Sequence, residues 1–338
     1  MNLLSIIVPV YNVEPYLARC LQSLQNQDLP KDRYEIIVVN DGSFDNSKDI
    51  VLEFVKKNNN IVLIDKENSG VSSARNAGIE KAEGEYIMFV DGDDYIEENI
   101  LKFLTDYVIK SALQIGLFTL RNEGVENTNN KDNNLAQVVT GTELYRKYRR
   151  NEVDSSCTML IERSLLVEKK IKYTSGIPYL EDGEFLARLM CVADRCAFFD
   201  YPYYIRVVRP NSATTSNLFF SEKAIDGFIK AAINLKDFRD NSVANCDKKE
   251  FMNQPIVKFV VTAVYSCKSL NTFKLLPYVK NKLSKNGFEK LDLSGCEPFH
   301  TELGNAYNIS IYYYFFWRVA KTTLNSLVHK GKLLRKIN

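Results

Sequence analysis

Four short runs rich in isoleucine and valine alternate with segments of helical spacing over the first hundred residues. The runs span residues 3–10, 35–39, 61–64 and 86–90. Apolar runs of this length are expected of strands that are buried on both faces of a parallel sheet. Between them, apolar side chains recur at helical spacing in residues 17–24, 50–55 and 71–82. This alternation predicts an α/β fold with a right-handed, mostly parallel, Rossmann-like sheet that is flanked by helices.

The rest of the chain separates into a continuation of the sheet region and a helical region. Residues 113–120 predict one more strand, and the asparagine-rich stretch 122–134 has no apolar face, which predicts an exposed loop. From about residue 221 onward, long helical patterns occur without further strand runs. Because 338 residues exceed the usual size of one domain, we expect a sheet domain over 1–217 and a mainly helical domain over 218–338.

The charge balance and the cysteines argue against several classes of protein. The chain has 44 basic and 42 acidic residues, so its net charge of +2 provides no overall field for binding nucleic acid. Its 7 cysteines show no paired spacing and it has 2 histidines, which argues against a structural zinc site. The N-terminal residues lack the basic start of a signal peptide, and no stretch reaches the roughly 20 apolar residues of a spanning helix. We therefore expect reduced thiols and a cytoplasmic location.

Polar clusters follow each of the four predicted strands. In open α/β sheets, ligands bind beyond the carboxyl ends of the strands, so these clusters are candidates for a binding site. The most informative cluster is Asp91-Gly92-Asp93-Asp94. In extended backbone Asp91 and Asp93 project to the same side, and Gly92 lets a ligand approach the chain closely. Neighbouring carboxylates repel one another and their oxygens suit Mn²⁺ or Mg²⁺, so the cluster predicts a divalent-metal site.

An acidic turn is the alternative interpretation of the same cluster. Aspartate favours turns and helix N-caps, and a helix is expected to begin near Glu97. Taken alone, the cluster is as compatible with a cap of that helix as with a metal site. An EF-hand is excluded, because residues 95–98 do not continue the alternating oxygen ligands of such a loop.

Four sequence motifs occur in the first hundred residues in a fixed order. They read S-I-I-V-P-V-Y-N at residues 5–12, V-N-D-G-S-x-D-x-S at 39–47, N-x-G-x-S-x-A-R-N-x-G at 68–78 and D-x-D at 91–93. In order and spacing they resemble the inverting GT-A glycosyltransferases of family-two type. The resemblance covers roughly residues 3–100 and implies a GT-A fold that binds a nucleotide diphosphate sugar.

The resemblance implies a donor site of Pro9, Tyr11, Glu14, Asp41, Asn68, Gly70, Arg75, Asn76, Asp91 and Gly92. Pro9, Tyr11 and Glu14 would line the nucleoside pocket, with the Tyr11 ring stacked on the base. Asp41 would accept a hydrogen bond from the base, which favours uracil. Taken alone, Asp41-Gly42-Ser43 is equally typical of a turn followed by an N-cap.

The resemblance also divides the phosphate and metal contacts among three side chains. Arg75 would reach the diphosphate or the sugar of the nucleotide through its fork of donors, and Asn76 would support the loop that carries it. Asp93 would ligate the metal. Asp91 would hold the ribose or take part in the metal site, directly or through water.

A carboxylate for proton transfer is expected farther along the chain. Residues 179–185 read Y-L-E-D-G-E-F and resemble the family's E-D-x-x-F element, whose aspartate is the usual base. This implies that Asp182 takes the proton of the acceptor hydroxyl while that oxygen attacks the anomeric carbon. The alternative is that Glu181 and Asp182 only open the helix carrying Phe185, where acids favour the helix dipole. The two interpretations are compatible.

An arginine-bearing segment follows at residues 203–212. It resembles the Y-x-R…S element of the family, in which an arginine closes over the diphosphate. The sequence offers both Arg206 and Arg209. We assign the donor contact to Arg206, and which of the two makes it stays open at this stage.

The last third of the chain carries an aromatic run. Residues 309–319 read I-S-I-Y-Y-Y-F-F-W-R-V, and lysine and arginine recur after them. Aromatic rings beside cations suit a membrane interface, so residues 309–338 predict peripheral contact with the inner face of the plasma membrane. A buried helix with a solvated basic tail is the alternative, and a homo-oligomer interface also remains open.

These features predict a metal-assisted inverting glycosyltransferase that moves a UDP-linked sugar to a glycan or lipid-linked acceptor in surface polysaccharide biosynthesis. A sugar nucleotidyltransferase would need a glycine-rich loop with a basic residue after the first strand, and residues 5–14 lack one. A catalytically silent sugar-nucleotide-binding module would be expected to have lost Asp91, Asp93 or Asp182. All three are present.

Overall fold

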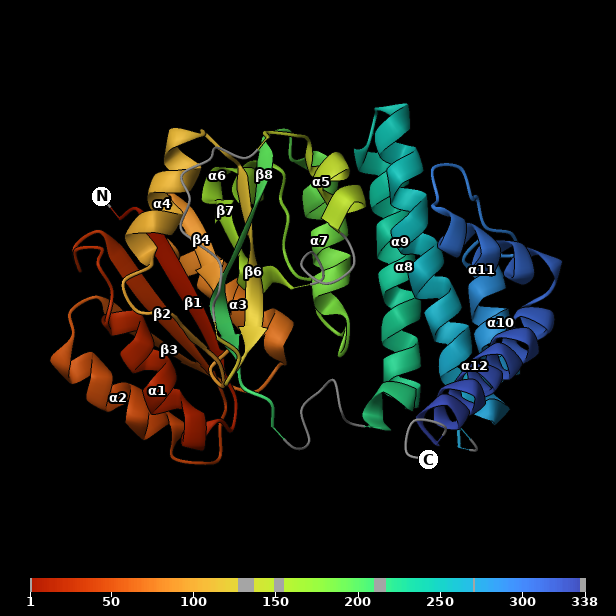
Figure 1. The fold of residues 1–338 in the computed structure, drawn as a ribbon, viewed down its shortest axis with the longest axis horizontal. Helices are drawn as coiled ribbons and strands as arrows, with labels where there is room; N and C mark the ends of the chain where they lie inside the picture. The colour runs from red at the N-terminus through yellow and green to blue at the C-terminus, as the bar shows by residue number, and fades with distance from the viewer. Residues whose placement is uncertain (1, 127–136, 149–154, 210–216, 270, 335–338) are drawn as a thin grey trace. The chain divides into compact units, whose positions relative to one another are not determined.

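The computed structural model describes residues 2–126, 137–148, 155–209, 217–269 and 271–334, with side chains described up to residue 323 in the last of these stretches (Figure 1). These residues form two compact units. The first comprises residues 1–176 and 180–210, and the second comprises residues 177–179 and 211–338. The domain boundary expected after residue 217 stays a prediction.

One eight-stranded sheet forms the first unit, in the order β3-β2-β1-β4-β7-β6-β8-β5. Its strands are β1 (Leu4–Val10), β2 (Tyr34–Asp41), β3 (Ile61–Lys66), β4 (Tyr86–Phe89), β5 (Tyr95–Ile96), β6 (Ile115–Asn122), β7 (Met159–Glu162) and β8 (Cys196–Arg206). The first four pair in parallel. β7 is antiparallel to β4 and β6, β8 is parallel to β6, and β5 is antiparallel to β8. The sheet is therefore mixed, with its parallel half built from the first hundred residues.

Helices cover both faces of this sheet. They are α1 (Glu14–Gln25), α2 (Ser47–Lys57), α3 (Val71–Lys81), α4 (Leu101–Lys110), α5 (Gly141–Tyr148), α6 (Arg163–Glu168) and α7 (Glu181–Val192), with a 3₁₀ turn at Ser156–Thr158. The chain moves outward from β1 to β3 and then returns to β4 on the other side of β1. Because crossovers are right-handed, this reversal puts α3 on the opposite face from α1 and α2. The α/β prediction is confirmed, and the reversal between β1 and β4 is where ligands bind in such sheets.

The parallel strands are buried as their sequences predict. All seven residues of β1 and all eight of β2 are buried, as expected of strands covered on both faces. Helix α3 packs so closely on β1 that a Cβ added to Gly78 would lie 2.3 Å from Ile7 Cγ2. The glycine in this helix is therefore required by packing.

Two short strands had no recognisable signal in the sequence. β5 has 2 residues, and β7 has 4, of which three are apolar, so neither shows an alternation or an apolar run of at least four residues. Both join the sheet through partners distant in sequence, which is a tertiary effect. The predicted loop at 122–134 begins at the end of β6, and its residues from 127 onward lie outside the described part of the chain.

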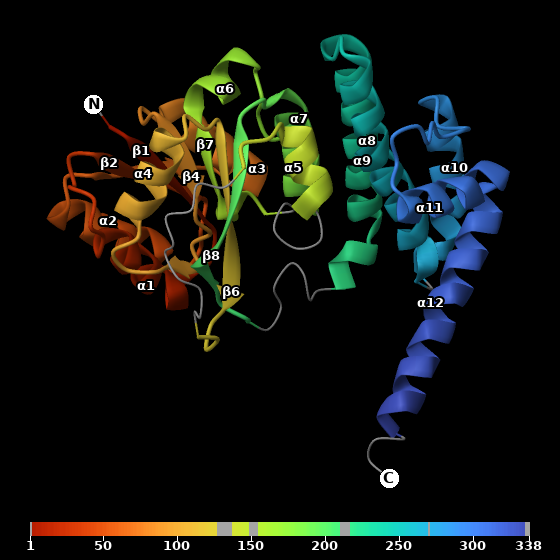
Figure 2. The same ribbon diagram turned by 45° about the horizontal axis from the view of Figure 1, so that its top comes forward.

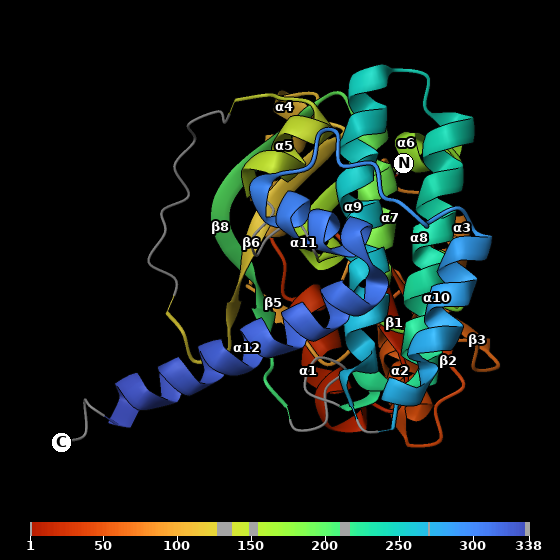
Figure 3. The ribbon, with the colours of Figure 1, turned by 90° about the vertical axis from the view of Figure 1, so that its right-hand side faces the viewer.

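The second unit is helical, as the sequence predicts. Its helices are α8 (Glu222–Ser242), α9 (Cys246–Tyr265), α10 (Leu276–Lys285), α11 (Pro298–Ile309) and α12 (Ile311–Leu334), with 3₁₀ turns at Asn217–Phe220, Ser266–Lys268 and Phe273–Leu275. α8 and α9 lie side by side as a helical hairpin (Figures 1 and 3). In the described part of the chain, no helix combines the length and the apolar character that crossing a bilayer requires.

Candidate active site

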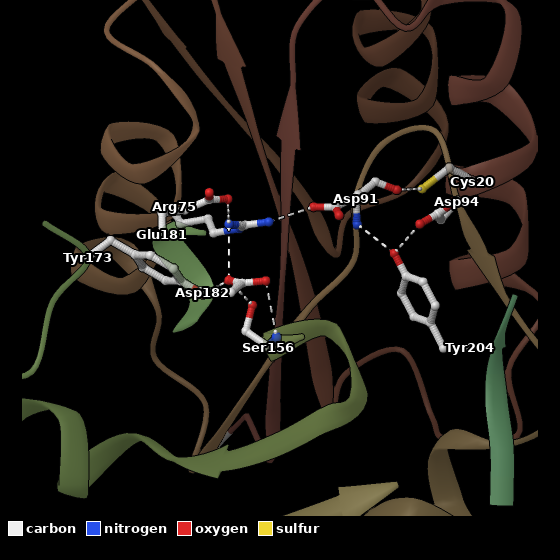
Figure 4. Close-up of polar contacts among 9 residues, drawn as sticks. All are labelled: Cys20, Arg75, Asp91, Asp94, Ser156, Tyr173, Glu181, Asp182 and Tyr204. Carbon is white, nitrogen blue, oxygen red and sulfur yellow. Dashed lines mark hydrogen bonds and ion pairs between the residues drawn. The ribbon is translucent and has the colours of Figure 1, made fainter. Parts of the chain in front are cut away.

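Predicted site residues collect where the strand order reverses. Tyr11 directly follows β1. β4, which pairs with β1 on the side away from β2, leads to Asp91. Figure 4 shows Arg75 from α3 and Asp182 from α7 pointing toward the same place as Asp91. Segments from three parts of the sequence thus meet at one edge of the sheet.

Arg75 is the centre of this cluster. Its buried guanidinium donates to Asp91 Oδ1 at 2.9 Å, to Glu181 Oε1 at 3.0 Å and to Asp182 Oδ1 at 3.3 Å. Burial by itself lowers the pKa of an arginine, but the surrounding negative charges, Asp182 foremost, outweigh it and hold the pKa of Arg75 well above its usual value. One permanent cation therefore ties the acid after β4 to the two acids at the start of α7.

Asp182 is fixed by further donors besides Arg75. Its Oδ1 accepts from Ser156 Oγ at 2.9 Å and from the Tyr173 hydroxyl at 3.0 Å. Its Oδ2 accepts from the Ser156 backbone N–H at 3.3 Å. The side chain is 17% exposed, so this held carboxylate can still be reached from solvent. Glu181 and Asp182 also open α7, and the helix-start interpretation is confirmed along with the convergence on Arg75.

Tyr173 is held in place on three sides. Its ring stacks on Phe185, with centroids 4.0 Å apart and planes 5° apart. Asn76 Nδ2 donates to the Tyr173 carbonyl at 2.9 Å, and the Tyr173 N–H donates to Asn76 Oδ1 at 2.8 Å. Burial raises the pKa of Tyr173 well above its usual value, so its hydroxyl stays protonated and donates to Asp182. Asn76 thus holds the Tyr173 segment in place, in addition to any support it gives its own loop.

Asp94 points inward to β8. Its Oδ2 accepts from the Tyr204 hydroxyl at 2.7 Å, and its Oδ1 accepts from the Val207 N–H at 2.8 Å. Burial and the charge of Asp91 raise the pKa of Asp94 to about 7, against the hydrogen bond from Tyr204. The Tyr204 hydroxyl also accepts from the Asp91 N–H at 3.2 Å, so it links both ends of the acidic cluster to β8.

Asp93 faces an arginine from the end of the first unit. Arg209 Nε lies 2.5 Å from Asp93 Oδ2, and the Arg209 guanidinium carbon lies 5.7 Å from the centre of the Tyr16 ring. Burial and Asp91 raise the pKa of Asp93, and Arg209 opposes them. Arg206 donates instead to Asn122 Oδ1, at 2.9 and 3.1 Å. The structure therefore brings Arg209, and not the Arg206 we selected from sequence, to the acidic cluster.

The acidic turn does not cap a helix. α4 begins at Leu101, after an Ile100 N-cap that has no capping side chain of its own. The N–H groups of Ile100 and Leu101 donate to Gln27 Oε1, at 3.0 and 3.2 Å. The alternative interpretation of Asp91–Asp94 as a cap is therefore wrong, because Gln27, which follows the end of α1, already fills that role.

The charges of the cluster favour a cation. Five carboxylates, those of Asp91, Asp93, Asp94, Glu181 and Asp182, surround two guanidinium groups, those of Arg75 and Arg209. Within the described residues, no three His, Cys, Asp or Glu side chains form a ready-made metal cage. Such a cage is not required, because Mg²⁺ typically takes one or two carboxylates together with substrate phosphate oxygens. The excess of carboxylates therefore fits a cation that binds along with a phosphate ligand.

An exposed aromatic pair lies beside the acidic cluster. The Tyr11 and Phe44 rings meet edge to face, with centroids 6.0 Å apart, and both are exposed. The loops that carry them are joined, because the Asn12 N–H donates to Ser43 Oγ at 3.1 Å and the Phe44 N–H donates to Asn12 Oδ1 at 2.8 Å. A planar base could stack on this pair. The motif predicted Tyr11, whereas Phe44 occupies a variable motif position and was missed.

Asp41 organises the loop before α3. Its Oδ1 accepts from Lys66 Nζ at 2.5 Å and from the Ser69 N–H at 3.0 Å, and its Oδ2 accepts from the Gly70 N–H at 2.8 Å. Gly70 has a φ of +89°, a conformation that L side chains rarely adopt. Asp41 thus shapes the loop before α3, and its contact with a base stays a prediction.

For the other predicted donor residues, the structure shows their burial and, for some, contacts that stabilise the fold. Pro9 is buried within β1, and Asn68 is exposed. Glu14 accepts from the Asn46 N–H and side-chain amide, at 3.1 and 2.8 Å, so it holds the start of α2. A Cβ on Gly92 would lie 3.2 Å from the Pro9 carbonyl oxygen, so close packing against the end of β1 also favours a glycine there.

Three contributors to the site were not selected from sequence. Ser156, Tyr173 and Tyr204 lie outside the recognised motifs or carry no expected role, and each touches an acid of the cluster. Single hydroxyl residues at these positions have no spacing that predicts such a contact. Only the packing of β8 and of the segments around α7 places them here.

The family comparison agrees with this geometry. Residues 5–171, about half of the chain, match the family model described as glycosyl transferase family 2. The uncharacterized glycosyltransferase EpsJ of Bacillus subtilis (strain 168) is 34% identical over 218 residues, which make up 63% of this chain and 63% of EpsJ. The match thus spans less than two thirds of that relative, and other curated relatives are matched over smaller shares of their length.

Two solved structures share the fold. Residues 1–349 of S. aureus TarS in complex with UDP-GlcNAc superpose with a TM-score of 0.56 at 22% identity, covering 85% of this chain and 89% of that chain. The mannosyltransferase PcManGT from Pyrobaculum calidifontis, in complex with GDP-Man and Mn²⁺, gives a TM-score of 0.51 at 14% identity, covering 93% of this chain and 87% of that one. At these identities, both likenesses establish the fold alone, and the GT-A prediction is confirmed.

Proposed function

Because the chain belongs to glycosyl transferase family 2, we propose that it is an inverting glycosyltransferase that moves a sugar from a UDP-linked donor to an acceptor hydroxyl. The observation that carries this proposal is the joint placement of Asp91 and Asp182 by one buried cation, Arg75. It brings a donor-side acid and an accessible carboxylate to the same edge of the sheet.

Asp182 is the general base of the proposed reaction. The acceptor oxygen attacks the anomeric carbon of the donor sugar and loses its proton to Asp182, while the bond to the diphosphate breaks and its electron pair leaves with UDP. We assign the proton to Oδ2, which accepts one hydrogen bond from the described residues, whereas Oδ1 accepts three. Direct displacement of this kind inverts the anomeric configuration.

Asp93 and Asp91 would hold Mn²⁺ or Mg²⁺. The bound metal would supply positive charge next to the departing diphosphate. Asp93 reaches that position only if its ion pair with Arg209 is exchanged for the metal, and the released Arg209 would then face the diphosphate oxygens. Each oxygen of Asp94 already accepts a hydrogen bond, from Tyr204 or from Val207, and we assign this residue a structural role.

The nucleoside would lie against the exposed Tyr11 ring, with Pro9, Glu14, Asn68, Gly70 and Gly92 around it. The choice of UDP rests on the family motif at Asp41 and on TarS, whose structure contains UDP-GlcNAc. PcManGT was solved with GDP-Man, so the base must be tested directly. TarS is named a poly(ribitol-phosphate) beta-N-acetylglucosaminyltransferase, which supports a polymer acceptor. The choice of a glycan or lipid-linked acceptor in surface polysaccharide synthesis rests on the family resemblance.

Thermal unfolding with nucleotides tests the donor. We expect UDP with Mn²⁺ to raise the melting temperature of the full chain more than GDP with Mn²⁺ or either component alone. An equal or larger rise with GDP would contradict the uracil assignment. No rise with any nucleoside diphosphate would contradict the donor site as a whole.

Replacement of Asp182 tests the base. Asp182→Asn should lower the transfer rate by about 10²- to 10⁴-fold, because it removes the proton acceptor, and it should leave stabilisation by UDP and Mn²⁺ largely intact. Asp106→Asn, which changes an exposed acid of α4 that pairs with Lys102, is the matched control. Retained transfer by Asp182→Asn would reject this residue as the base.

A further inference from the structure

The first turns of α12 present an aromatic face to solvent. Tyr312, Tyr313 and Phe316 are 38%, 48% and 56% exposed, and their spacing puts them within about 100° of the helix circumference. Phe273, from the 3₁₀ turn at Phe273–Leu275, is 48% exposed, and its ring centroid lies 6.3 Å from that of Phe316. We call these four side chains the aromatic face.

The opposite side of α12 accounts for the core of this region. Ile311, Tyr314 and Phe315 are buried, and the Tyr314 hydroxyl donates to the Val261 carbonyl at 3.1 Å in α9. The helix is therefore already anchored by one apolar side. The alternative of a buried helix holds for this side of α12 only, and the aromatic face stays exposed after the core is filled.

Positive charge is concentrated in the same part of the chain. Residues 266–338 contain 12 basic and 4 acidic residues, a net charge of +8, whereas residues 1–265 contain 32 basic and 38 acidic residues, a net charge of −6. One of these cations borders the aromatic face directly, because Lys280 Nζ lies 5.1 Å from the centre of the Tyr312 ring. The nearly neutral total thus hides a strongly basic helical region.

The second half of α12 extends away from the other helices of its unit (Figures 2 and 3). The sequence of its last turns and of the residues that follow adds Lys330, Lys332, Arg335 and Lys336. An exposed aromatic face and a basic, projecting helix are thus continuous along one element. This combination is typical of helices that lie in the plane of a membrane interface.

We propose that the aromatic face of α12, together with the basic residues around and beyond it, binds the surface of a membrane that contains anionic lipids. Tyrosine rings prefer the headgroup level, where their hydroxyls stay hydrated, and phenylalanine rings enter the acyl boundary. Lysine and arginine close to an anionic surface are attracted to it. The inference does not depend on the proposed sugar donor or on the base.

Charge favours a bilayer over a second copy of the chain. A symmetric dimer through this face would bring two regions of net charge +8 together, which repel each other. A free polyanion would satisfy the cations but would leave the aromatic rings in water. An anionic bilayer satisfies both features at once.

Vesicle sedimentation with the full chain tests the proposal. We expect co-sedimentation with vesicles of phosphatidylglycerol and phosphatidylcholine in equal parts. Binding to vesicles of phosphatidylcholine alone should be weaker by about tenfold or more. The double variant Tyr312→Ser/Phe316→Ser should bind the mixed vesicles at least about tenfold more weakly, because burial of one such ring contributes more than a tenfold step. Salt at about 1 M, where the Debye length is roughly 3 Å, should weaken binding of the unchanged protein.

A matched control removes two exposed apolar side chains of the first unit, Ile109 and Val167. Ile109→Ser/Val167→Ser should bind the mixed vesicles as the unchanged protein does. Far-ultraviolet circular dichroism and melting curves must show that both double variants are folded. Equal binding by the aromatic variant, or no binding by the unchanged protein, overturns the proposal. A dimer that the aromatic variant dissociates, without vesicle binding, overturns it in favour of a protein interface.

Discussion

The guanidinium of Arg75 lies 2.9 Å from Asp91 Oδ1, and its other amino group reaches Asp182 at 3.3 Å. These two acids are far apart in the sequence, one at the end of β4 and the other at the start of α7. Arg75 is therefore the contact that joins the acid after β4 to the acid at the start of α7, which are the donor side and the acceptor side of the proposed reaction. Its replacement should affect both stability and turnover.

We expect Arg75→Met to destabilise the first unit by about 2–3 kcal/mol at neutral pH, because it leaves three half-buried carboxylates without their cation, a change that costs more when the acids are fully buried. Transfer should fall together with stability, since Asp182 loses one of its fixed donors. Urea unfolding measures the change. The control is Arg19→Met, which removes an exposed arginine that pairs with Glu123 and should cost less than about 1 kcal/mol. Equal effects of the two variants would contradict the central role of Arg75.

Tyr173 is predicted to be a positioning residue for Asp182. Tyr173→Phe removes a donor to a carboxylate, and such a bond contributes about 1.5–3 kcal/mol, so kcat should fall about tenfold or more. KM for the sugar nucleotide should stay unchanged, because the hydroxyl contacts Asp182 and not the donor side.

Tyr34→Phe is the control for that measurement. It removes another buried tyrosine hydroxyl of the same unit, one that donates to the Leu24 carbonyl at 3.0 Å. If a general loss of stability were the cause, kcat would fall by the same factor in both variants. A rise of the donor KM in Tyr173→Phe would show that the residue acts through donor binding.

The half-buried acid Glu181 predicts a dependence of stability on pH. Burial raises the pKa of Glu181 from 4.5 to about 7, with Arg75 opposing the rise and Asp182 adding to it. The folded state therefore binds this proton more tightly than the unfolded state, and the stability gained from it is lost as the pH rises from about 4.5 to about 7.

Glu181→Gln should remove this dependence. As the pH rises between these values, we expect the melting temperature of the variant to increase relative to that of the unchanged protein. The exposed change Glu80→Gln serves as control. A constant difference between Glu181→Gln and the unchanged protein over the interval would contradict the prediction.

Gly78 should not tolerate a side chain. In Gly78→Ala the new methyl group would lie 2.3 Å from Ile7 Cγ2, so α3 must move away from β1. Overpacking of this kind costs about 1–3 kcal/mol, and denaturant unfolding measures it. Ser73→Ala, in the same helix, should cost little. Because α3 carries Arg75, the kcat of Gly78→Ala should fall as well, and an unchanged rate would show that the helix shift does not reach the site.

Local sequence was sufficient for the parallel half of the sheet. β1 and β2 are built around apolar runs rich in isoleucine and valine and are buried on both faces, and such runs have few other stable arrangements in water. Once the strands are located, the polar residues that follow them are located as well, because residues directly after a buried strand lie at the edge of the sheet. Asp91, Arg75 and Asp182 were named from motifs, and the structure brings the three together.

The sequence did not predict the contacts between segments that are far apart in the chain. Ser156 and Tyr173 reach Asp182 because the segments around α7 fold over it, and neither residue type has a spacing that predicts this contact. Arg206 and Arg209 looked alike in sequence. Arg206 is the last residue of β8 and is paired with Asn122 of β6, so its side chain is committed there, whereas Arg209 lies beyond the strand and reaches Asp93.

The sequence by itself determined the α/β class, the helical second region and the acids of the candidate site, because hydrophobic periodicity and motif spacing are local properties of the chain. The tertiary structure decided which donors hold each acid, which arginine faces Asp93 and which side of α12 stays exposed. These depend on how segments far apart in the chain pack against one another. Packing fixes side-chain partners only after the core has formed, so no local pattern records them.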